Sequence, residues 1–292
     1  MTAESPKYSI LDHRVAGWYF PWMMKGLTPT SSPLEQKIRL MKSLGYDGVG
    51  TSWWDLVAFY QERGELRQLQ RLSAELTFPL TAFGFVAEGW AFGSGKAQQN
   101  AILLAKSSLD LAYAAGCDGA YLVGPFDSGN LRDAGKAFRE IAQYAASLGM
   151  NLALEFMGAA AQVKDLDTAR ELLDHANAPN TGIALDSYHF FAGGSSFRAL
   201  EEFPISQILL VHLADGPADL SDPSLELDRQ MPGYGELRLR EFVQMVHAKG
   251  FRGYWHVECI QGRDYATDLK AVAQRALTSM RGVVEDAIHQ HR

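Results

Sequence analysis

Four polar residues end four apolar segments in the second half of the chain, and together they could hold a metal ion. They are Glu155, Asp186, His212 and Glu258. Burying an ionised group without a partner is costly, so four such endings in consecutive apolar segments predict that the charges meet. Three carboxylates and one imidazole suit a divalent cation. We therefore expect one divalent ion, with Mn²⁺ favoured and Mg²⁺, Co²⁺ or Zn²⁺ also compatible with these ligands.

Such a site predicts proton transfer next to a carbonyl group. A divalent ion that chelates a carbonyl oxygen and an adjacent hydroxyl acidifies the neighbouring carbon, and a carboxylate can then remove its proton. Glu155 and Glu258 belong to different segments and approach from different sides, which makes them the candidates for the acid/base pair. The metal-stabilised enediolate can be reprotonated on another carbon, reprotonated on its opposite face, or lose a β-hydroxyl. These outcomes are isomerisation, epimerisation and dehydration.

Eight apolar segments alternate with helical patterns and are predicted to be the strands that position these residues. Most are continuous apolar runs, which is typical of parallel strands covered on both faces. The candidate strands are residues 14–18, 46–53, 79–86, 119–126, 152–156, 182–188, 208–215 and 254–260. The first candidate helix ends near Gly45. The others span about 55–76, 96–115, 131–148, 165–176, 197–202, 238–249 and 266–287, and Gly64 is a candidate interruption of the helix at 55–76.

This alternation predicts a (β/α)₈ TIM barrel formed by a single domain over residues 1–292. An open, doubly wound sheet is the structural alternative, but no Gly-x-Gly-x-x-Gly sequence follows the first strand. The carboxyl ends of barrel strands converge, and the four polar residues fall at those ends of strands five to eight. Ala153 and Ala184 share a predicted face with Glu155 and Asp186, which leaves space near the barrel axis.

Composition and charge indicate which classes of partner and which cell compartment to expect. The chain has 292 residues and a net charge of -7, which argues against a nucleic-acid partner. Two cysteines, Cys117 and Cys259, are too few for a disulfide framework and favour a reducing compartment. The N-terminus has no apolar secretory segment, and no apolar run reaches about 18 residues, so we expect a cytoplasmic protein without a membrane partner. The GSGK at 93–96 lacks the rest of a phosphate loop.

Several stretches resemble the xylose isomerase-like barrel family of sugar isomerases, epimerases and dehydratases. They are LALEFMG, GIALDSYHFF, ILLVHLADG, DRQMPGYGELRL and GYWHVECI. Arg229 followed by MPGYGE is the most specific piece and resembles the segment after strand seven in inosose isomerase-like members. The resemblance covers the C-terminal half well and the N-terminal half only by architecture. It implies that the four polar residues bind one divalent cation and that Glu155 and Glu258 act as the acid/base pair.

The resemblance also implies a small sugar or cyclitol substrate, and it leaves a homo-oligomer open. His189 is expected to contact a substrate oxygen, and Arg229 to stabilise enediolate charge. Their alternatives are a capping histidine and an exposed loop charge. Aromatic rings near strand ends can stack on the carbon-bound hydrogens of a sugar, although such rings are more often core residues. The remaining substrate-binding candidates are Trp18, Trp53, Trp90 and Glu88.

The sequence therefore favours a metal-dependent isomerase or epimerase of a keto sugar or keto-inositol. The same site also suits a lyase, such as a keto-inositol dehydratase, a dehydroshikimate dehydratase or a C-glycoside deglycosidase. Endonuclease-IV-like phosphodiester hydrolysis needs additional histidine ligands and a basic surface, and neither is apparent. A sugar-binding barrel without catalysis is disfavoured by the complete set of four ligand residues.

Overall fold

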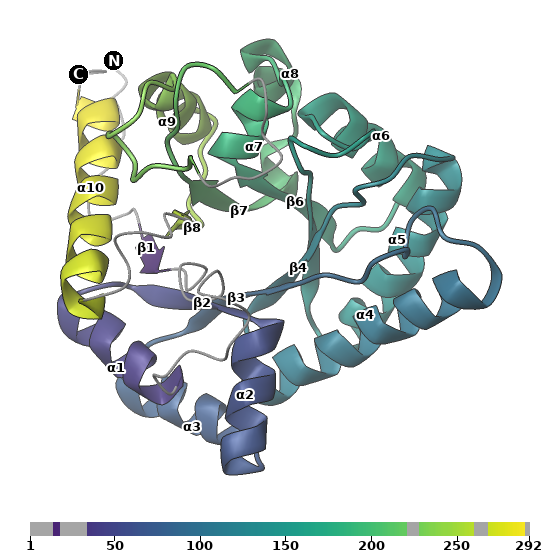
Figure 1. Cartoon of the computed structure of the whole chain (residues 1–292), viewed down its shortest axis with the longest axis horizontal. Helices are drawn as coiled ribbons and strands as arrows, with labels where there is room; N and C mark the ends of the chain where they lie inside the picture. The colour runs from purple at the N-terminus through teal and green to yellow at the C-terminus, as the bar shows by residue number, and fades with distance from the viewer. Residues whose placement is uncertain (1–13, 18–33, 221–227, 260–267, 290–292) are drawn as a thin grey trace, which may run out of the picture.

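The computed structural model describes residues 14–17, 34–220, 228–259 and 268–289. Within these ranges, eight parallel strands pair in sequence order and β1 pairs with β8, so that the sheet closes into the predicted TIM barrel (Figure 1). The strands are β1 (Arg14–Gly17), β2 (Gly48–Ser52), β3 (Leu80–Phe85), β4 (Gly119–Val123), β5 (Asn151–Glu155), β6 (Thr181–Asp186), β7 (Ile208–Leu213) and β8 (Tyr254–Val257).

Helices surround the barrel on its outer side (Figure 1). They are α1 (Leu34–Leu44), α2 (Trp53–Arg63), α3 (Arg67–Leu76), α4 (Gly95–Ala115), α5 (Leu131–Ser147), α6 (Leu166–Ala176), α7 (Ser187–Ala192), α8 (Phe197–Glu202), α9 (Leu239–Ala248) and α10 (Leu269–His289), with a 3₁₀ turn at Ile205–Gln207. Every helix within the described ranges falls short of the length or hydropathy that a membrane crossing requires.

The helical pattern at 55–76 forms two helices, as Gly64 suggested. Gly64 adopts a left-handed conformation with φ 74° and donates its N–H to the carbonyl of Tyr60, which ends α2. A residue with a side chain is disfavoured in this conformation, so glycine is a common helix terminator. At the other end of α2, Ser52 and Asp55 form a capping box. Trp53 therefore begins the helix and does not extend β2, contrary to the predicted strand 46–53.

The predicted strands 119–126 and 182–188 extend too far. The first ends at Val123. The second ends at Asp186, because the Asp186 carboxylate accepts the backbone N–H of His189 and thereby caps α7 at Ser187. A capping carboxylate satisfies a free N–H at a helix start. This turn of helix places His189 back over the end of β6, where a continued strand would carry it away.

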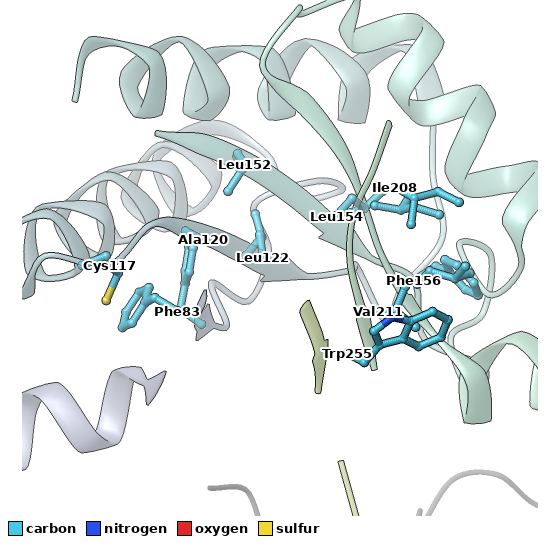
Figure 2. Close-up of a cluster of buried hydrophobic side chains, with 14 of the residues drawn as sticks. Phe83, Cys117, Ala120, Leu122, Leu152, Leu154, Phe156, Ile208, Val211 and Trp255 are labelled. Atoms are coloured by element: carbon cyan, nitrogen blue, oxygen red, sulfur yellow. The ribbon is translucent and has the colours of Figure 1, made fainter. Parts of the chain in front are cut away.

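Two apolar layers hold the barrel. The larger lies between the strands and the helices and includes Leu154, Val211 and Trp255 (Figure 2). A smaller cluster faces the barrel axis and consists of Ala82, Tyr121, Ala153, Ala184 and Leu210. The predicted small residues are thus on the inner face, while Trp255 packs outside. This arrangement leaves room at the strand ends for the polar groups that follow.

Candidate metal centre

Four strand ends bring the predicted ligand residues together. Glu155 and Asp186 are the last residues of β5 and β6, His212 is near the end of β7, and Glu258 directly follows β8. Each residue offers one ligand atom, and these atoms all lie within 4.8 Å of one another. All four residues are at most 4% exposed. The expected convergence is therefore present, and parallel strands closing into a barrel are its cause.

His212 lies at the middle of this four-residue cluster. Its Nδ1 is 2.7 Å from both Glu155 Oε1 and Glu258 Oε2, and 4.0 Å from Asp186 Oδ2. One ring nitrogen carries at most one hydrogen, so it cannot make a full, linear hydrogen bond to both glutamates at once. Glu258 Oε2 is buried, and no described residue offers it a well-aligned hydrogen bond. A buried set of three carboxylate donors and one imidazole fits a divalent cation.

The cluster also binds protons tightly. Burial, assisted by Glu258 and Asp186, raises the pKa of Glu155 to about 8 even though His212 opposes the rise. Burial by itself lowers the pKa of His212, but Glu258 and Glu155 together raise it to about 10. A metal ligand must give up its proton, so a cation entering this site competes with protons at Glu155 and His212.

Arg229 lies against the cluster and is fully buried. Its Nη1 donates to Asp186 Oδ2 at 2.9 Å and lies 4.0 Å from Glu258 Oε2, and its Nη2 is 2.9 Å from His189 Nε2. Burial disfavours the charged form of Asp186, yet Arg229, followed by His189 and His212, holds the pKa of that carboxyl below its ordinary value. Arg229 is therefore a buried partner of the cluster, and the alternative of an exposed loop charge is wrong.

His189 joins the same group of side chains. It is 2% exposed, and its Nδ1 accepts the backbone N–H of Gly158 at 3.2 Å. Its neighbour Tyr188 lies under the guanidinium of Arg229, with 4.6 Å between the guanidinium carbon and the ring centroid. The Tyr188 hydroxyl donates to Asp228 at 2.5 Å. The short helix α7 thus holds Arg229 from one side through two adjacent aromatic residues.

Asp215 is a buried acidic residue that the sequence interpretation did not select. Its carboxylate accepts backbone N–H groups from Gly216, Leu237 and Gly233 at 2.9, 3.1 and 3.0 Å. These hydrogen bonds hold the segment 228–237, which carries Arg229, against the end of β7. The available signal was the dipeptide Asp215–Gly216 directly after the seventh strand, because an aspartate next to a glycine is common in turns, where its carboxylate accepts nearby backbone N–H groups.

Beneath the cluster lie two further polar side chains. His256 Nε2 is 2.8 Å from the Thr81 hydroxyl, and its ring lies edge-on to His212 with centroids 5.5 Å apart. Tyr121 also meets the His212 ring edge-on, with ring centroids 5.0 Å apart.

Cys259 is buried and donates to the carbonyl of Gln230 at 3.1 Å, so its role is packing and support of the segment 228–237.

The other predicted substrate-binding residues have different surroundings. Trp53 is half-buried against the outer core, and its ring meets Trp54 edge-on at 4.8 Å. Trp90 is 2% exposed and packs against Phe138, while Glu88 is exposed, and both line a small cavity beyond β3. Trp18 lies outside the described residues. His189 and Arg229 are thus the two of these candidates that contact the four-residue cluster.

Comparisons with known proteins agree with this architecture. The chain is 28% identical over 153 residues to an inosose isomerase of Halalkalibacterium halodurans, a match that covers 52% of this chain and 53% of that protein. It is 27% identical over 260 residues to a 3-dehydroshikimate dehydratase of Pseudomonas aeruginosa, covering 86% of this chain and 40% of that protein. The chain thus spans about half or less of the length of these curated relatives.

A solved structure and a family model extend the comparison to most of the chain. The structure of an IolI protein with a bound zinc atom superposes with a TM-score of 0.80 at 22% identity, covering 88% of this chain and 94% of that one. At this identity the likeness shows the fold. The model of the xylose isomerase-like TIM barrel matches residues 38–282, which include all four residues of the cluster as well as His189 and Arg229. The chain therefore belongs to the xylose isomerase-like TIM barrel family.

Proposed function

We propose that the protein is a divalent-metal-dependent isomerase or epimerase of a keto sugar or keto-inositol. The observation that carries the proposal is the convergence of Glu155, Asp186, His212 and Glu258, whose ligand atoms lie within 4.8 Å of one another. The inosose isomerases among its relatives and the zinc atom of the IolI structure support this assignment. The four residues are the proposed ligands, and Mn²⁺ is the proposed ion.

The bound cation would supply Lewis-acid polarisation of a substrate carbonyl, which acidifies the adjacent carbon. Glu155 and Glu258 are the proposed acid/base pair, since they reach the cluster from β5 and β8 and flank His212 at equal distances of 2.7 Å. Burial makes the Glu155 carboxylate a stronger base than a solvated one, which suits the removal and return of a carbon-bound proton.

Arg229 is proposed to stabilise the negative charge that develops on the substrate oxygens. Its guanidinium stays charged at all relevant pH values and is fully buried, where an electrostatic interaction is stronger than in water. The contact with Asp186 keeps that carboxylate ionised, and the contact with His189 fixes the direction of the guanidinium. His189 in turn is held by Gly158, so this side of the site is arranged before substrate binds.

A lyase on the same site is the second candidate, because the 3-dehydroshikimate dehydratase match covers 86% of the chain. Both reactions begin with removal of a proton next to a carbonyl. They differ afterwards, because a lyase expels a β-hydroxyl and forms an enone, whereas an isomerase or epimerase returns the proton. The acid/base residues are the same in the two schemes, so the product decides between them.

Solvent deuterium exchange tests the proposal. Protein loaded with Mn²⁺ and checked by elemental analysis is incubated in D₂O with 2-keto-myo-inositol, a set of ketohexoses and 3-dehydroshikimate, and the products are identified by NMR. We expect deuterium at a carbon next to the carbonyl of a keto-inositol or ketohexose, without an enone. Glu155→Gln keeps an oxygen ligand but removes the base, so it should retain metal and lose exchange.

The matched control is Glu171→Gln, which changes an exposed glutamate on α6 and should leave exchange intact. Loss of water from 3-dehydroshikimate, which leaves an aromatic dihydroxybenzoate, would favour the lyase. Metal-loaded protein that exchanges none of these substrates, or a Glu155→Gln variant that exchanges as fast as the wild type, would contradict the proposed chemistry.

A further inference from the structure

Three buried side chains beneath the four-residue cluster connect to His212. The Tyr121 ring meets the His212 ring edge-on with centroids 5.0 Å apart, and the His256 ring meets it edge-on with centroids 5.5 Å apart. His256 Nε2 in turn lies 2.8 Å from the Thr81 hydroxyl. All four residues are buried. The proposed chemistry uses His212 but assigns no role to the other three.

Tyr121 reaches His212 across the barrel. The two residues are on β4 and β7, and β5 and β6 lie between these strands. The intervening strands contribute Ala153 and Ala184 to the same inner cluster as Tyr121. Because both of these side chains are single methyl groups, they leave the space through which the Tyr121 ring contacts His212.

Thr81 reaches His256 in the same way. These residues lie on β3 and β8, which β1 and β2 separate in the closed sheet. Gly48 on β2 has no side chain, and an added Cβ there would clash with the Thr81 methyl group. Glycine at this position therefore leaves room for Thr81, and the Thr81 hydroxyl fixes one ring nitrogen of His256 where this ring packs against His212.

The orientation of the His212 ring decides whether its Nδ1 can bind a cation. Nδ1 lies 2.7 Å from carboxylate oxygens of both Glu155 and Glu258, so the ring plane directs this atom at the other ligand residues. Rotation of a histidine ring about its Cβ–Cγ bond has no narrow intrinsic minimum, so neighbouring groups set the plane. A hydrogen bond to a glutamate does so only while Nδ1 carries a hydrogen, which a bound cation replaces. Contacts outside the cluster must therefore hold the ring once Nδ1 has lost its hydrogen.

We propose that Tyr121 and His256 are positioning residues that hold the plane of the His212 ring so that its Nδ1 faces the other ligand residues. Edge-on contact is a favoured arrangement of two aromatic rings, and a rotated His212 ring would lose it at both neighbours. The inference rests on the proposed function, in which His212 is a ligand of the cation, and it adds residues that determine how tightly the cation binds. Replacing residues that orient a metal-binding histidine typically weakens metal binding about 10- to 100-fold.

The mobility of the His212 ring tests this role without any metal. Protein with ¹³C- and ¹⁵N-labelled histidine contains eight labelled rings, and His212→Gln identifies the His212 signals. NMR relaxation of the ring carbons reports motion on the picosecond-to-nanosecond timescale. We expect a rigid ring in the metal-free wild type and a mobile ring in Tyr121→Leu, which removes the edge-on contact. Tyr121→Phe keeps an aromatic ring and should keep His212 rigid.

Mn²⁺ titration measures the consequence for the metal centre. We expect Mn²⁺ to bind Tyr121→Leu about 10- to 100-fold more weakly than the wild type, and Tyr121→Phe within about 3-fold of it. Thr81→Val preserves the shape of the side chain but removes the hydroxyl that fixes His256. It should make the His212 ring more mobile and weaken Mn²⁺ binding about 3- to 10-fold. Thr81→Ser keeps the hydroxyl and should restore both properties.

Two exposed positions provide matched controls. Tyr113→Leu on α4 and Thr278→Val on α10 make the same replacements, and both should leave the His212 ring motion and the Mn²⁺ affinity unchanged. Thermal unfolding of each metal-free variant separates a loss of folding from a loss of binding. If Tyr121→Leu does not fold, the comparison of Thr81→Val with Thr81→Ser decides alone.

The inference is overturned if folded Tyr121→Leu or Thr81→Val keeps a rigid His212 ring, or if either variant binds Mn²⁺ as tightly as the wild type. It is also overturned if Tyr121→Phe loses as much affinity as Tyr121→Leu, because the hydroxyl and not the ring contact would then matter. Wild-type protein that binds no divalent cation contradicts the proposed function instead. In that case the mobility of the His212 ring still decides whether Tyr121 and His256 hold it.

Discussion

Asp215 and Gln230 lie opposite one another in an antiparallel bridge, and the backbone N–H of each donates to the carbonyl of the other at 2.8 and 2.7 Å. Gln230 directly follows Arg229, so the bridge ties this buried arginine to the end of β7. The Asp215 side chain strengthens the tie by accepting the backbone N–H groups of Gly233 and Leu237 from this segment, in addition to that of its neighbour Gly216. The position of the Arg229 guanidinium therefore depends on a carboxylate that does not touch it.

Asp215→Ala should lower stability and disturb Arg229 together. Three N–H groups lose their acceptor. That of Gly216 is buried, whereas Gly233 and Leu237 are exposed and half-buried and can turn to water, so we expect a loss of about 1–3 kcal/mol in the free energy of unfolding. Urea unfolding measures this loss. Asp174→Ala, at an exposed position of α6, is the control and should be nearly neutral. Equal stability of the two variants would contradict the stabilising role of the Asp215 hydrogen bonds.

Arg229→Lys should reduce turnover although it keeps the charge. The guanidinium reaches Asp186 and His189 with two separate nitrogens, and a lysine ammonium cannot span both. Loss of one stabilising donor typically costs about 10²–10³-fold in kcat, and we expect a drop of that order with a smaller change in KM. Steady-state kinetics and partial rescue of Arg229→Ala by added guanidinium check the prediction.

The control for this change is Arg238→Lys, which alters an exposed arginine just before α9. It should leave both kinetic constants close to those of the wild type. Normal turnover in Arg229→Lys would show that charge alone suffices at this position and would remove the case for two directed contacts.

Metal-free protein should become less stable as the pH rises, and a divalent cation should reverse this trend. The pKa of Glu155 rises on folding from 4.5 to about 8 and that of His212 from 6.5 to about 10, so the folded state holds more protons than the unfolded state in these ranges. The stability that Glu155 contributes is fully present below pH 4.5 and is lost as the pH rises to about 8. The stability that His212 contributes is fully present below pH 6.5 and is lost as the pH rises to about 10.

Thermal unfolding between about pH 5 and about pH 9, with a chelator or with Mn²⁺, measures both effects. Because the cation displaces protons, its stabilising shift should grow with pH. Glu155→Gln should flatten the lower part of the metal-free profile. A shift that is independent of pH, or a chelated protein that gains stability toward high pH, would argue against this linkage.

Gly124→Ala should displace Glu155. A Cβ at residue 124 would lie 2.5 Å from the backbone carbonyl oxygen of Glu155. Because this oxygen belongs to the backbone, no side-chain rotation can relieve the clash. We expect a loss of about 1–3 kcal/mol in stability, as for other overpacked sites, together with weaker Mn²⁺ binding. Isothermal titration with Mn²⁺ and urea unfolding measure the two losses.

Gly282→Ala is the matched control, because an added Cβ in α10 meets no atom within 4 Å. Alanine is the better helix former, so this variant should be neutral or stabilised by up to about 1 kcal/mol. If Gly124→Ala bound Mn²⁺ as tightly as Gly282→Ala, the close approach of β4 to Glu155 would have no bearing on the site.

The sequence by itself determined the barrel and its four candidate ligands. Continuous apolar runs alternating with helical patterns indicate parallel strands that are covered on both faces. A charged residue at the end of such a run is costly to bury unless it meets a partner, so it is expected at a site where charges converge. Glu155, Asp186, His212 and Glu258 were identifiable for this reason. The inward alanines Ala153 and Ala184 also followed, because side chains alternate along a strand.

The tertiary structure decided the contacts that no local pattern contains. Asp186 caps α7 and so returns His189 toward the site, and Asp215 holds the segment of Arg229. Each of these depends on groups that are far apart in the chain or on a hydrogen bond that ends a strand early. Local sequence preferences do not encode such pairings, because the partners meet only when the barrel closes.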